Sequence, residues 1–373
     1  MRLSVIILNY NVRYFLQQCI LSVKRAINSI HAEIIVIDNN SEDDSCDMVK
    51  NNFPEVILIE NKENVGFSKA YNQTVKDAKG EYICILNPDT AVAEDTFIKS
   101  LHYADSIKNL GALSIYLMDG TGAFLPESKR NLPTPKVSLL KLMGNGKNYY
   151  ANHLADEDNG EIDILVGAFM LLKRSVYNKV EGFDEDYFMY GEDIDFSYKI
   201  TKAGYKNNYM GSIEILHYKG ESTKKDGAYL DRFYGSMRIF YKKHFKTNVF
   251  LNASVIAGVF IAKIMRRISE NKKENYSINT KITYLLTENL TLLKKLSNIL
   301  DKEIKTTSKT IFSDKTLTNC QFIFDVDYMS YTQIFKVMKK HSNLGNTYYI
   351  RPSGCNFILG SDRSDQKGNV IVF

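Results

Sequence analysis

The chain has 373 residues, of which 44% are hydrophobic and 24% charged; these proportions are ordinary for a folded protein and exclude a disordered or collagen-like chain. At roughly 100–200 residues per domain, the length predicts two domains, or one large domain with appended segments. The 48 basic and 43 acidic residues give a net charge of +5, which is too small over this length to favour a nucleic-acid partner. The five cysteines include no Cys-x-x-Cys pair, so we expect reduced thiols in a cytosolic protein, without a disulfide framework or a zinc site.

Apolar runs of strand length recur through the first hundred residues, separated by segments with a helical spacing of apolar residues. The runs lie at 3–8, 33–37, 56–59 and 82–86. Strands this apolar, separated by helices, predict an α/β fold with a mostly parallel sheet covered on both faces. In such open sheets ligands bind beyond the carboxyl ends of the strands, so we expect the functional residues in the turns that follow them. The polar residues of these turns include Asn9, Asn11, Asp38, Asn39, Asn87 and Asp89.

Helices and loops are expected between and after these strands. Ser41 is placed to cap a helix over 42–51, and another helix begins near Phe67. From about residue 120 to 160 the periodicity gives way to Pro, Gly, Lys and Asn. This predicts a loop over the site, because functional loops of this length are more common than idle ones. Regular structure is expected again at 162–172 and 192–203.

The last part of the chain has two different patterns. Apolar residues at heptad positions over 278–303, with Asn289 at an a position, predict a helix that packs on its own domain. Beyond it, strands are expected at 321–326, 347–350 and 369–372, with a helix at 331–340. The chain then divides into an α/β domain over 1–245, a basic and apolar helical segment over 246–303 and a small α/β unit over 304–373.

An uncharged run at 247–262 lies inside a strongly basic region. Residues 241–273 contain eight Lys or Arg and a single acid, Glu270. The run is shorter than the roughly 17–25 apolar residues of a membrane span. We therefore expect peripheral contact with an anionic membrane, at the inner face of the cytoplasmic membrane; a buried amphipathic helix with solvated ends is the alternative. The N-terminus enters a strand directly, without the layout of a signal peptide.

Two common nucleotide-binding motifs are absent from the sequence. A dinucleotide site requires Gly-x-Gly-x-x-Gly after the first strand, where this chain has Asn9-Tyr10-Asn11-Val12. The P-loop pattern Gly-x-x-x-x-Gly-Lys-Ser/Thr does not occur either. These absences argue against a hydride-transfer enzyme and against a P-loop kinase or ATPase.

Four polar residues could carry chemistry. Asp89 ends the turn Asn87-Pro88-Asp89 and could bind Mg²⁺ or Mn²⁺, which prefer carboxylate and phosphate oxygens; an ordinary turn is the alternative. Glu192 and Asp193 open a helix, where the macrodipole also favours acids. The aromatic and acidic run before them could seat a carboxylate in a partly apolar pocket, where desolvation raises a pKa and makes a competent base. His217 follows a strand-like run, and a lone histidine is more often structural than a ligand.

These motifs, taken together and in order, resemble the bacterial glycosyltransferase family 2, especially its rhamnosyltransferase-like members that build surface polysaccharides. The resemblance covers about residues 2–245. Each motif is weak alone, but their number, order and spacing make a strong signal. They comprise residues 5–11, 36–41, 61–67 with Asn72, 86–89, 167–171 and 182–195, and His217 with Ser222.

The resemblance implies a GT-A fold, which is a Rossmann-like domain for nucleotide sugars, and inverting transfer of a hexose from a nucleoside diphosphate. Rhamnose is the sugar suggested by the subgroup, and a growing, lipid-linked cell-surface glycan is the implied acceptor. A divalent cation, Mg²⁺ or Mn²⁺, is implied at the family's Asp-x-Asp position, where the first acid is Asn87 here. By the same resemblance Asp193 is the general base, Glu192 is its neighbour, and Asp89 and His217 lie at the metal. The implied nucleotide-binding residues are Asn9, Asn11, Asp38, Asn39, Asn64, Gly66, Phe67 and Asn72, and those on the side of the donor and acceptor sugars are Asn87, Gly167 and Ala168.

Two other functions remain open at this point. A catalytically silent relative could act as a scaffold in a membrane pathway of polysaccharide assembly, although the intact Asp89, Asp193 and His217 argue against silence. A sugar nucleotidyltransferase would need a glycine-rich, arginine-bearing first loop, and the first loop here contains neither residue type.

Overall fold

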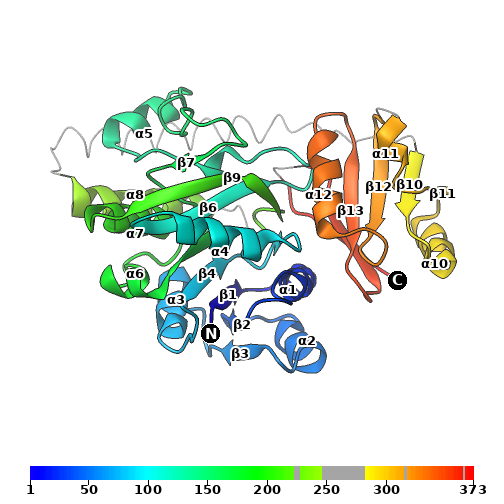
Figure 1. The fold of residues 1–373 in the computed structure, drawn as a ribbon, viewed down its shortest axis with the longest axis horizontal. Coiled ribbons are helices and arrows are strands. Elements are labelled where there is room, and N and C mark those ends of the chain that lie inside the picture. Colours follow the sequence, from blue (N-terminus) through cyan, green and yellow to red (C-terminus); the bar gives the residue numbers. More distant parts are fainter. Residues whose placement is uncertain (222–226, 246–281, 315–316, 364–365) are drawn as a thin grey trace.

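The computed structural model describes residues 1–221, 227–245, 282–314, 317–363 and 366–373, which form two sheets with flanking helices (Figure 1). The uncharged run 247–262, most of the basic segment 241–273 and Ser222 lie outside the described residues. Membrane contact through that segment therefore stays a prediction. Among the helices of the described ranges, none combines the length and apolar composition needed to cross a membrane.

The first four strands form the parallel part of a nine-stranded sheet, in the spatial order β3-β2-β1-β4. They are β1 (Leu3–Asn9), β2 (Ala32–Asp38), β3 (Ile57–Glu60) and β4 (Tyr82–Leu86). Successive side chains of a strand point to opposite faces, so Val5 and Ile7 enter one core while Ile6 enters the other. This burial on both faces explains why the strands read as continuous apolar runs.

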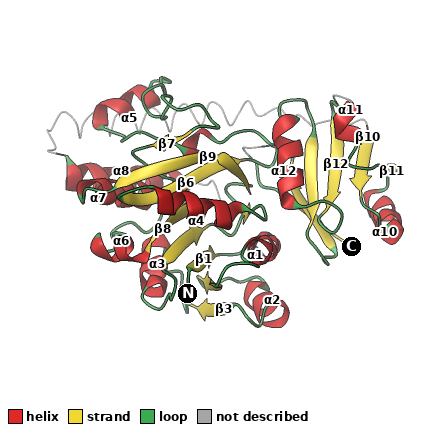
Figure 2. Cartoon of the chain, in the orientation of Figure 1, coloured by secondary structure: helices red, strands yellow, loops and turns green. Residues whose placement is uncertain are grey.

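Helices cover both faces of this sheet, as Figure 2 shows. The apolar sides of α1 (Arg13–Ala26), α2 (Ser45–Asn52) and α4 (Thr96–Ser106) pack mainly on the face that receives Val5 and Ile7. On the other face lie α3 (Phe67–Val75), α6 (Arg174–Lys179) and α7 (Glu192–Lys202). The expected helix cap at Ser41 is wrong: α2 begins at Ser45, because the Ser41 hydroxyl instead donates to Asp38.

The remaining strands make the sheet mixed. From β4 the order continues β8-β6-β9-β5, with β7 paired to β9; β8 is antiparallel to both its neighbours, and β6 and β9 are parallel. Their bounds are β5 (Thr90–Ala91), β6 (Leu110–Met118), β7 (Asn159–Glu161), β8 (Phe169–Lys173) and β9 (Lys206–His217), and α8 (Gly227–His244) follows. The predicted α/β class is confirmed, and the sheet predicted to be mostly parallel is parallel over β3-β2-β1-β4 and mixed beyond β4.

The segment from 120 to 160 is more regular than expected. It contains a short 3₁₀ helix, η1 (Pro126–Ser128), the helix α5 (Pro135–Leu142) and strand β7. Thr134 caps α5 by accepting a hydrogen bond from the Val137 amide, and Pro135 occupies its first turn, where its missing N–H costs nothing. The expectation of an irregular loop was wrong for these stretches, because α5 is too short to show a helical period.

The C-terminal unit is a six-stranded sheet in the order β11-β10-β12-β13-β14-β15. A helix across 278–303 was predicted, but Ile282–Leu286 is strand β10, paired in parallel with both β11 and β12, and Asn289 is the cap of α10. This sheet therefore includes residues on both sides of the expected boundary at 303. Its elements are β10 (Ile282–Leu286), α10 (Leu290–Leu300), β11 (Ile304–Thr306), α11 (Ile311–Asp314), β12 (Cys320–Asp325), α12 (Tyr331–Lys340), β13 (Thr347–Arg351), β14 (Phe357–Ser361) and β15 (Asn369–Val372).

The C-terminal unit packs directly on the first one. The Glu94 carboxylate accepts hydrogen bonds from the amides of Tyr331 and Thr332, each 2.9 Å long, at the N-terminus of α12. The Arg25 guanidinium donates to the Val326 carbonyl, 3.3 Å away. An anion at a helix N-terminus satisfies amides that have no partner within the helix.

Glu94→Ala is expected to lower the free energy of unfolding of the C-terminal unit by about 1–2 kcal/mol, since three charge-assisted hydrogen bonds are lost, two from the amides and one from the Thr332 hydroxyl. Urea unfolding and limited proteolysis would measure the loss. Glu55→Ala is the matched control, because Glu55 pairs with Lys24 at the surface and should change stability by less than about 0.5 kcal/mol. Equal stability of the two variants would contradict the role given to Glu94.

Candidate active site

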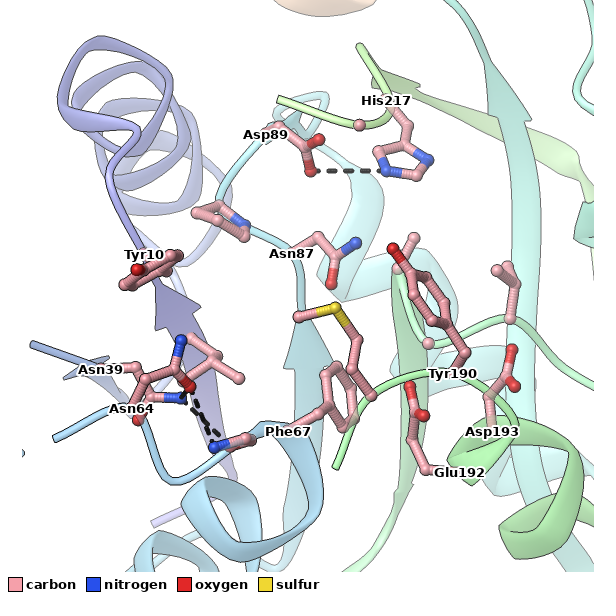
Figure 3. A pocket seen from close by; sticks show the side chains of 18 residues that line it. Tyr10, Asn39, Asn64, Phe67, Asn87, Asp89, Tyr190, Glu192, Asp193 and His217 are labelled. Atoms are coloured by element: carbon pink, nitrogen blue, oxygen red, sulfur yellow. Dashed lines mark hydrogen bonds and ion pairs between the residues drawn. The ribbon is translucent and has the colours of Figure 1, made fainter. Parts of the chain in front are cut away.

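A pocket of about 230 Å³ opens beyond the carboxyl ends of β1 and β4 and beside the start of α7. In Figure 3, Asp89 and His217 lie at one end, Glu192 and Asp193 lie at the other, and Asn87 lies between them. The location agrees with the expectation that polar residues gather at the carboxyl ends of the strands. The pocket is lined by Leu8, Tyr10, Asn39, Asn64, Gly66, Phe67, Asn87, Pro88, Asp89, Val166, Gly167, Ala168, Met189, Tyr190, Glu192, Asp193, His217 and Gly220.

One wall of the pocket is a network of side-chain amides. Asn39 Nδ2 donates to Asn64 Oδ1 at 3.2 Å and to the Gly66 carbonyl at 3.1 Å, and Asn61 donates to Asn39 at 2.8 Å. Gly66 has a φ of +82°, and a Cβ there would lie 2.5 Å from the Phe188 carbonyl oxygen. Only glycine fits this turn. The turn and the amide network together fix the chain where it enters α3.

Four of the predicted nucleotide-binding residues do not line the pocket. Asp38 is 2% exposed. Its two carboxylate oxygens accept hydrogen bonds from the Asn9 side chain, at 2.7 Å, and from the amide and hydroxyl of Ser41. Asn11 accepts from the Glu42 amide at 2.7 Å. These three predicted residues hold the turns after β1 and β2 in shape.

Asn72, the fourth, does not line the pocket, and its side chain bonds within the protein. Its Oδ1 accepts from the Tyr177 hydroxyl at 2.6 Å and from the Phe183 amide at 3.0 Å. Its Nδ2 donates to the Phe183 carbonyl, 2.9 Å away, and to Glu185, 3.0 Å away. The side chain thus ties α3 to the segment that leads into α7, which is a structural task.

At the first end of the pocket, His217 Nε2 lies 3.4 Å from Asp89 Oδ1. Asp89 is 4% exposed, so the carboxylate at this strand end is buried, although it lies in a turn. Burial alone would raise the pKa of Asp89, but the His217 ring and the Glu221 amide outweigh it and hold the pKa below the ordinary value. The second ring nitrogen of His217, Nδ1, is buried without a hydrogen-bond partner.

This end of the pocket also contacts the C-terminal unit. Glu221 donates its amide to Asp89 Oδ2 at 3.4 Å and accepts from the Gly368 amide at 2.6 Å. Lys367 donates to the Glu221 carbonyl, 2.6 Å away. Sequence reasoning did not connect the tail with the site, because the contact joins residues about 150 positions apart in the chain.

At the second end, Asp193 is paired with a residue that the sequence did not single out. Arg130 Nη2 donates to Asp193 Oδ2 at 2.6 Å and also to the Leu165 carbonyl. Both Arg130 and Asp193 are buried. Arg130 comes from the segment expected to be an irregular loop, so neither periodicity nor motif could have identified it. The pair fixes the direction of the Asp193 carboxylate.

Glu192 differs from its neighbour in having a buried oxygen without a partner, Oε2. Two causes raise the pKa of Glu192 to about 8: burial is the larger, and the negative charge of Asp193 is the second. Glu192 is therefore mostly protonated at neutral pH and can donate a hydrogen bond. Two adjacent carboxyl groups thus lie in different environments, one bound to Arg130 and one with an unpartnered oxygen, which is a common feature of sites that combine a base with a hydrogen-bond donor.

Glu192→Gln is expected to remove a loss of stability that the wild type suffers as pH rises from about 4.5 to about 8. The folded pKa, about 8, lies above the ordinary value of 4.5, so the folded state holds the proton between these values. The free energy of unfolding of the wild type therefore falls as pH rises from about 4.5 to about 8. The variant should lose about 1–3 kcal/mol less over that interval, measured by urea unfolding. Glu185→Gln, at an exposed carboxylate, should leave the wild-type pH profile unchanged.

Comparison with known proteins agrees with this geometry. Residues 4–181 match the model of "Glycosyl transferase family 2". The match covers just under half of the chain and includes most of the motifs that carried the resemblance. The predicted family resemblance and the prediction of a glycosyltransferase enzyme are confirmed, and the sheet and its pocket agree with the GT-A fold that the resemblance implied.

Two curated relatives are rhamnosyltransferases by name. The N-acetylglucosaminyl-diphospho-decaprenol L-rhamnosyltransferase of Mycobacterium tuberculosis is 26% identical over 231 residues, which cover 57% of this chain and 74% of that protein. The rhamnosyltransferase WbbL of Escherichia coli is 28% identical over 157 residues, covering 42% and 59% of the two chains. Among solved structures, a mannosyltransferase from Pyrobaculum calidifontis in complex with GDP-Man and Mn²⁺ is 17% identical, with a TM-score of 0.48 over 73% of this chain and 76% of that one.

Proposed function

We propose that this glycosyltransferase moves a hexose from a nucleoside diphosphate to a hydroxyl group of a glycan, with inversion at the sugar carbon. One observation carries the proposal: a single pocket holds Asp89 and His217 at one end and the Arg130-bound Asp193 at the other. A direct displacement needs the leaving diphosphate and the attacking hydroxyl on opposite sides of the sugar, and the two ends provide these two places.

Asp193 acts as the general base in this proposal. Its carboxylate takes the proton of the acceptor hydroxyl as that oxygen bonds to the sugar carbon, and the bond from this carbon to the diphosphate oxygen breaks. Arg130 keeps the carboxylate in one orientation through its 2.6 Å ion pair. Protonated Glu192 donates a hydrogen bond to the sugar or the acceptor. Asn39 and Asn64 form the wall that faces the nucleotide.

The first end of the pocket fits a divalent cation. The described residues contain no group of three or more His, Cys, Asp or Glu side chains that could hold a metal ion by themselves. Mg²⁺ in nucleotide sites commonly uses one or two protein ligands and completes its shell with phosphate oxygens and water. The buried Asp89 carboxylate and the His217 ring would hold it, and the cation would supply positive charge against the diphosphate.

Rhamnose is the proposed sugar, and a lipid-linked surface glycan is the proposed acceptor. The two rhamnosyltransferase relatives support the sugar, and the diphospho-decaprenol in the name of one supports a lipid-linked acceptor. Such an acceptor would place the protein at the inner face of the cytoplasmic membrane.

A panel of nucleoside diphosphate sugars tests the proposed function. Each donor is offered with Mg²⁺ or Mn²⁺, and the release of the nucleoside diphosphate is measured. Turnover of one donor with a strong preference is expected, and thymidine or uridine diphosphate rhamnose is the expected donor. Binding of donors without any turnover, even with lipid-linked acceptors, would instead support the catalytically silent scaffold.

A further inference from the structure

The helix α5 has no buried residue, although it carries several apolar side chains. Leu139 and Leu142 are each 41% exposed, and Met143, directly after the helix, is 75% exposed. Single exposed apolar residues are ordinary on a protein surface. Three exposed apolar side chains within five positions form a hydrophobic surface patch, which is unfavourable in water. We call Leu139, Leu142 and Met143 the α5 apolar face.

The chain around this face is strongly basic. Residues 129–150 contain Lys129, Arg130, Lys136, Lys141 and Lys147 and no Asp or Glu. Lys129 and Arg130 are buried and pair with Asp156 and Asp193, so the cations beside the α5 apolar face are Lys136, Lys141 and Lys147. Lys136 and Lys147 are exposed. Exposed apolar side chains flanked by cations are the combination that binds an anionic membrane surface.

Lys141 lies in an unusual environment on the same helix. Its ammonium nitrogen is 3.2 Å from the centre of the Tyr149 ring. Two causes lower the pKa of Lys141 to about 8: burial is the larger, and the positive charge of Arg130 is the second. A phosphate group nearby would stabilise the charged form of this side chain.

Contacts join α5 to the base end of the pocket. Tyr241 of α8 donates to the Ser138 hydroxyl at 2.5 Å and to the Pro133 carbonyl at 3.2 Å, which fixes α5 on the first unit. The same segment supplies Arg130, the partner of Asp193. Figure 1 shows α5 at the outer edge of the first unit, on the side away from α2 and α3.

We propose that the α5 apolar face rests on an anionic lipid bilayer, with Lys136, Lys141 and Lys147 against the phosphate headgroups. The inference deepens the proposed function, on which it rests, because it brings the membrane to the end of the pocket where the acceptor hydroxyl must meet Asp193. The charge pattern selects the occupant: a bilayer with anionic headgroups satisfies the exposed apolar side chains and the three lysines beside them together. A second copy of the chain would bring the same positive charge and repel.

Vesicle co-sedimentation of the full chain tests the proposal without any turnover. Wild-type protein should bind vesicles that contain phosphatidylglycerol, bind pure phosphatidylcholine vesicles weakly, and dissociate as salt rises. The triple variant L139S/L142S/M143S should bind at least about tenfold less well, since it loses the inserted side chains. The double variant K136Q/K147Q should lose the preference for anionic lipid.

Matched controls separate α5 from the rest of the chain. I98S and L290S change apolar residues that are 51% and 68% exposed elsewhere, and they should bind vesicles as the wild type does. The basic segment 241–273 is unchanged in every variant, so a loss in the triple variant reports on α5 alone. Equal vesicle binding by the triple variant and the wild type would overturn the proposal, as would absence of binding by the wild type.

Two further measurements distinguish the remaining outcomes. With a water-soluble acceptor the triple variant should keep the wild-type rate, while with a lipid-linked acceptor in vesicles its rate should fall about tenfold. If the wild type transfers sugar to no acceptor but still binds vesicles through α5, the proposed function fails and the membrane surface stands. A dimer of the wild type that the triple variant abolishes would assign the face to a second copy and overturn the membrane proposal.

Discussion

Asp193→Asn is expected to lower the rate of sugar transfer by about 10²–10⁴-fold, the usual contribution of a positioned general base. The amide keeps the size of the carboxylate but cannot accept the proton of the acceptor hydroxyl. Donor affinity should change by less than about threefold, because Asp193 lies at the end of the pocket opposite Asp89. Steady-state transfer rates and calorimetric donor binding would measure the two quantities.

The structure adds a cost that a surface carboxylate would not have. Asp193→Asn leaves the buried Arg130 without its anionic partner, and breaking a buried ion pair from one side costs about 3–5 kcal/mol. Folding must therefore be followed by circular dichroism in the same samples. The double variant R130M/D193N should recover part of the lost stability and none of the lost activity.

Asp195→Asn is the matched control for this prediction. It changes an acid two positions along α7 that is also buried and contacts a basic side chain, the His244 ring at 2.6 Å, but that does not line the pocket. It should lower stability and leave turnover near the wild-type value. If Asp193 serves only the N-terminus of the helix, Asp193→Asn will retain normal turnover, and the assignment of the base is then wrong. A larger loss in Glu192→Gln than in Asp193→Asn would move the base to Glu192.

Asp89→Asn is expected to weaken metal-dependent binding of a nucleoside diphosphate by at least about 100-fold. Loss of a mere hydrogen-bonding partner of a metal ligand already costs about 10–100-fold. Calorimetry with uridine or thymidine diphosphate in Mn²⁺, and again with a chelator, would measure the effect. With the chelator present, wild type and variant should bind equally weakly.

The Asn variant is preferable to Ala because Asp89 is buried against His217. Asp89→Ala would leave a cavity and an unpaired ring, so that its loss of binding could reflect misfolding. Glu127→Gln is a suitable control, since it removes a carboxylate that pairs with Lys219 and does not line the pocket. Unchanged Mn²⁺-dependent affinity in Asp89→Asn would exclude Asp89 from the metal site.

Local patterns in the sequence determined much of the first unit. The apolar runs at 3–8, 33–37 and 82–86 are strands β1, β2 and β4, because a strand buried on both faces is apolar at most of its positions. Since parallel strands end at one edge, the turns after them meet, and Asn39 and Asp89 do lie in one pocket. The motif at the start of α7 likewise placed Glu192 and Asp193 in that pocket.

Only the tertiary structure decided what each polar group touches. Asp38 and Asn72 belong to motifs that suggested nucleotide binding, but their side chains form hydrogen bonds with other residues of the protein. Arg130 lies in a segment without a hydrophobic period. Its role follows from the 2.6 Å contact with Asp193, 63 positions away in the chain. Hydrophobic periodicity reports which side of an element is buried, whereas partners across the chain depend on how the elements pack. For the same reason the exposed face of α5 became visible only in the folded chain: the sequence predicted a loop there, whereas Leu139 and Leu142 lie on the surface of a helix.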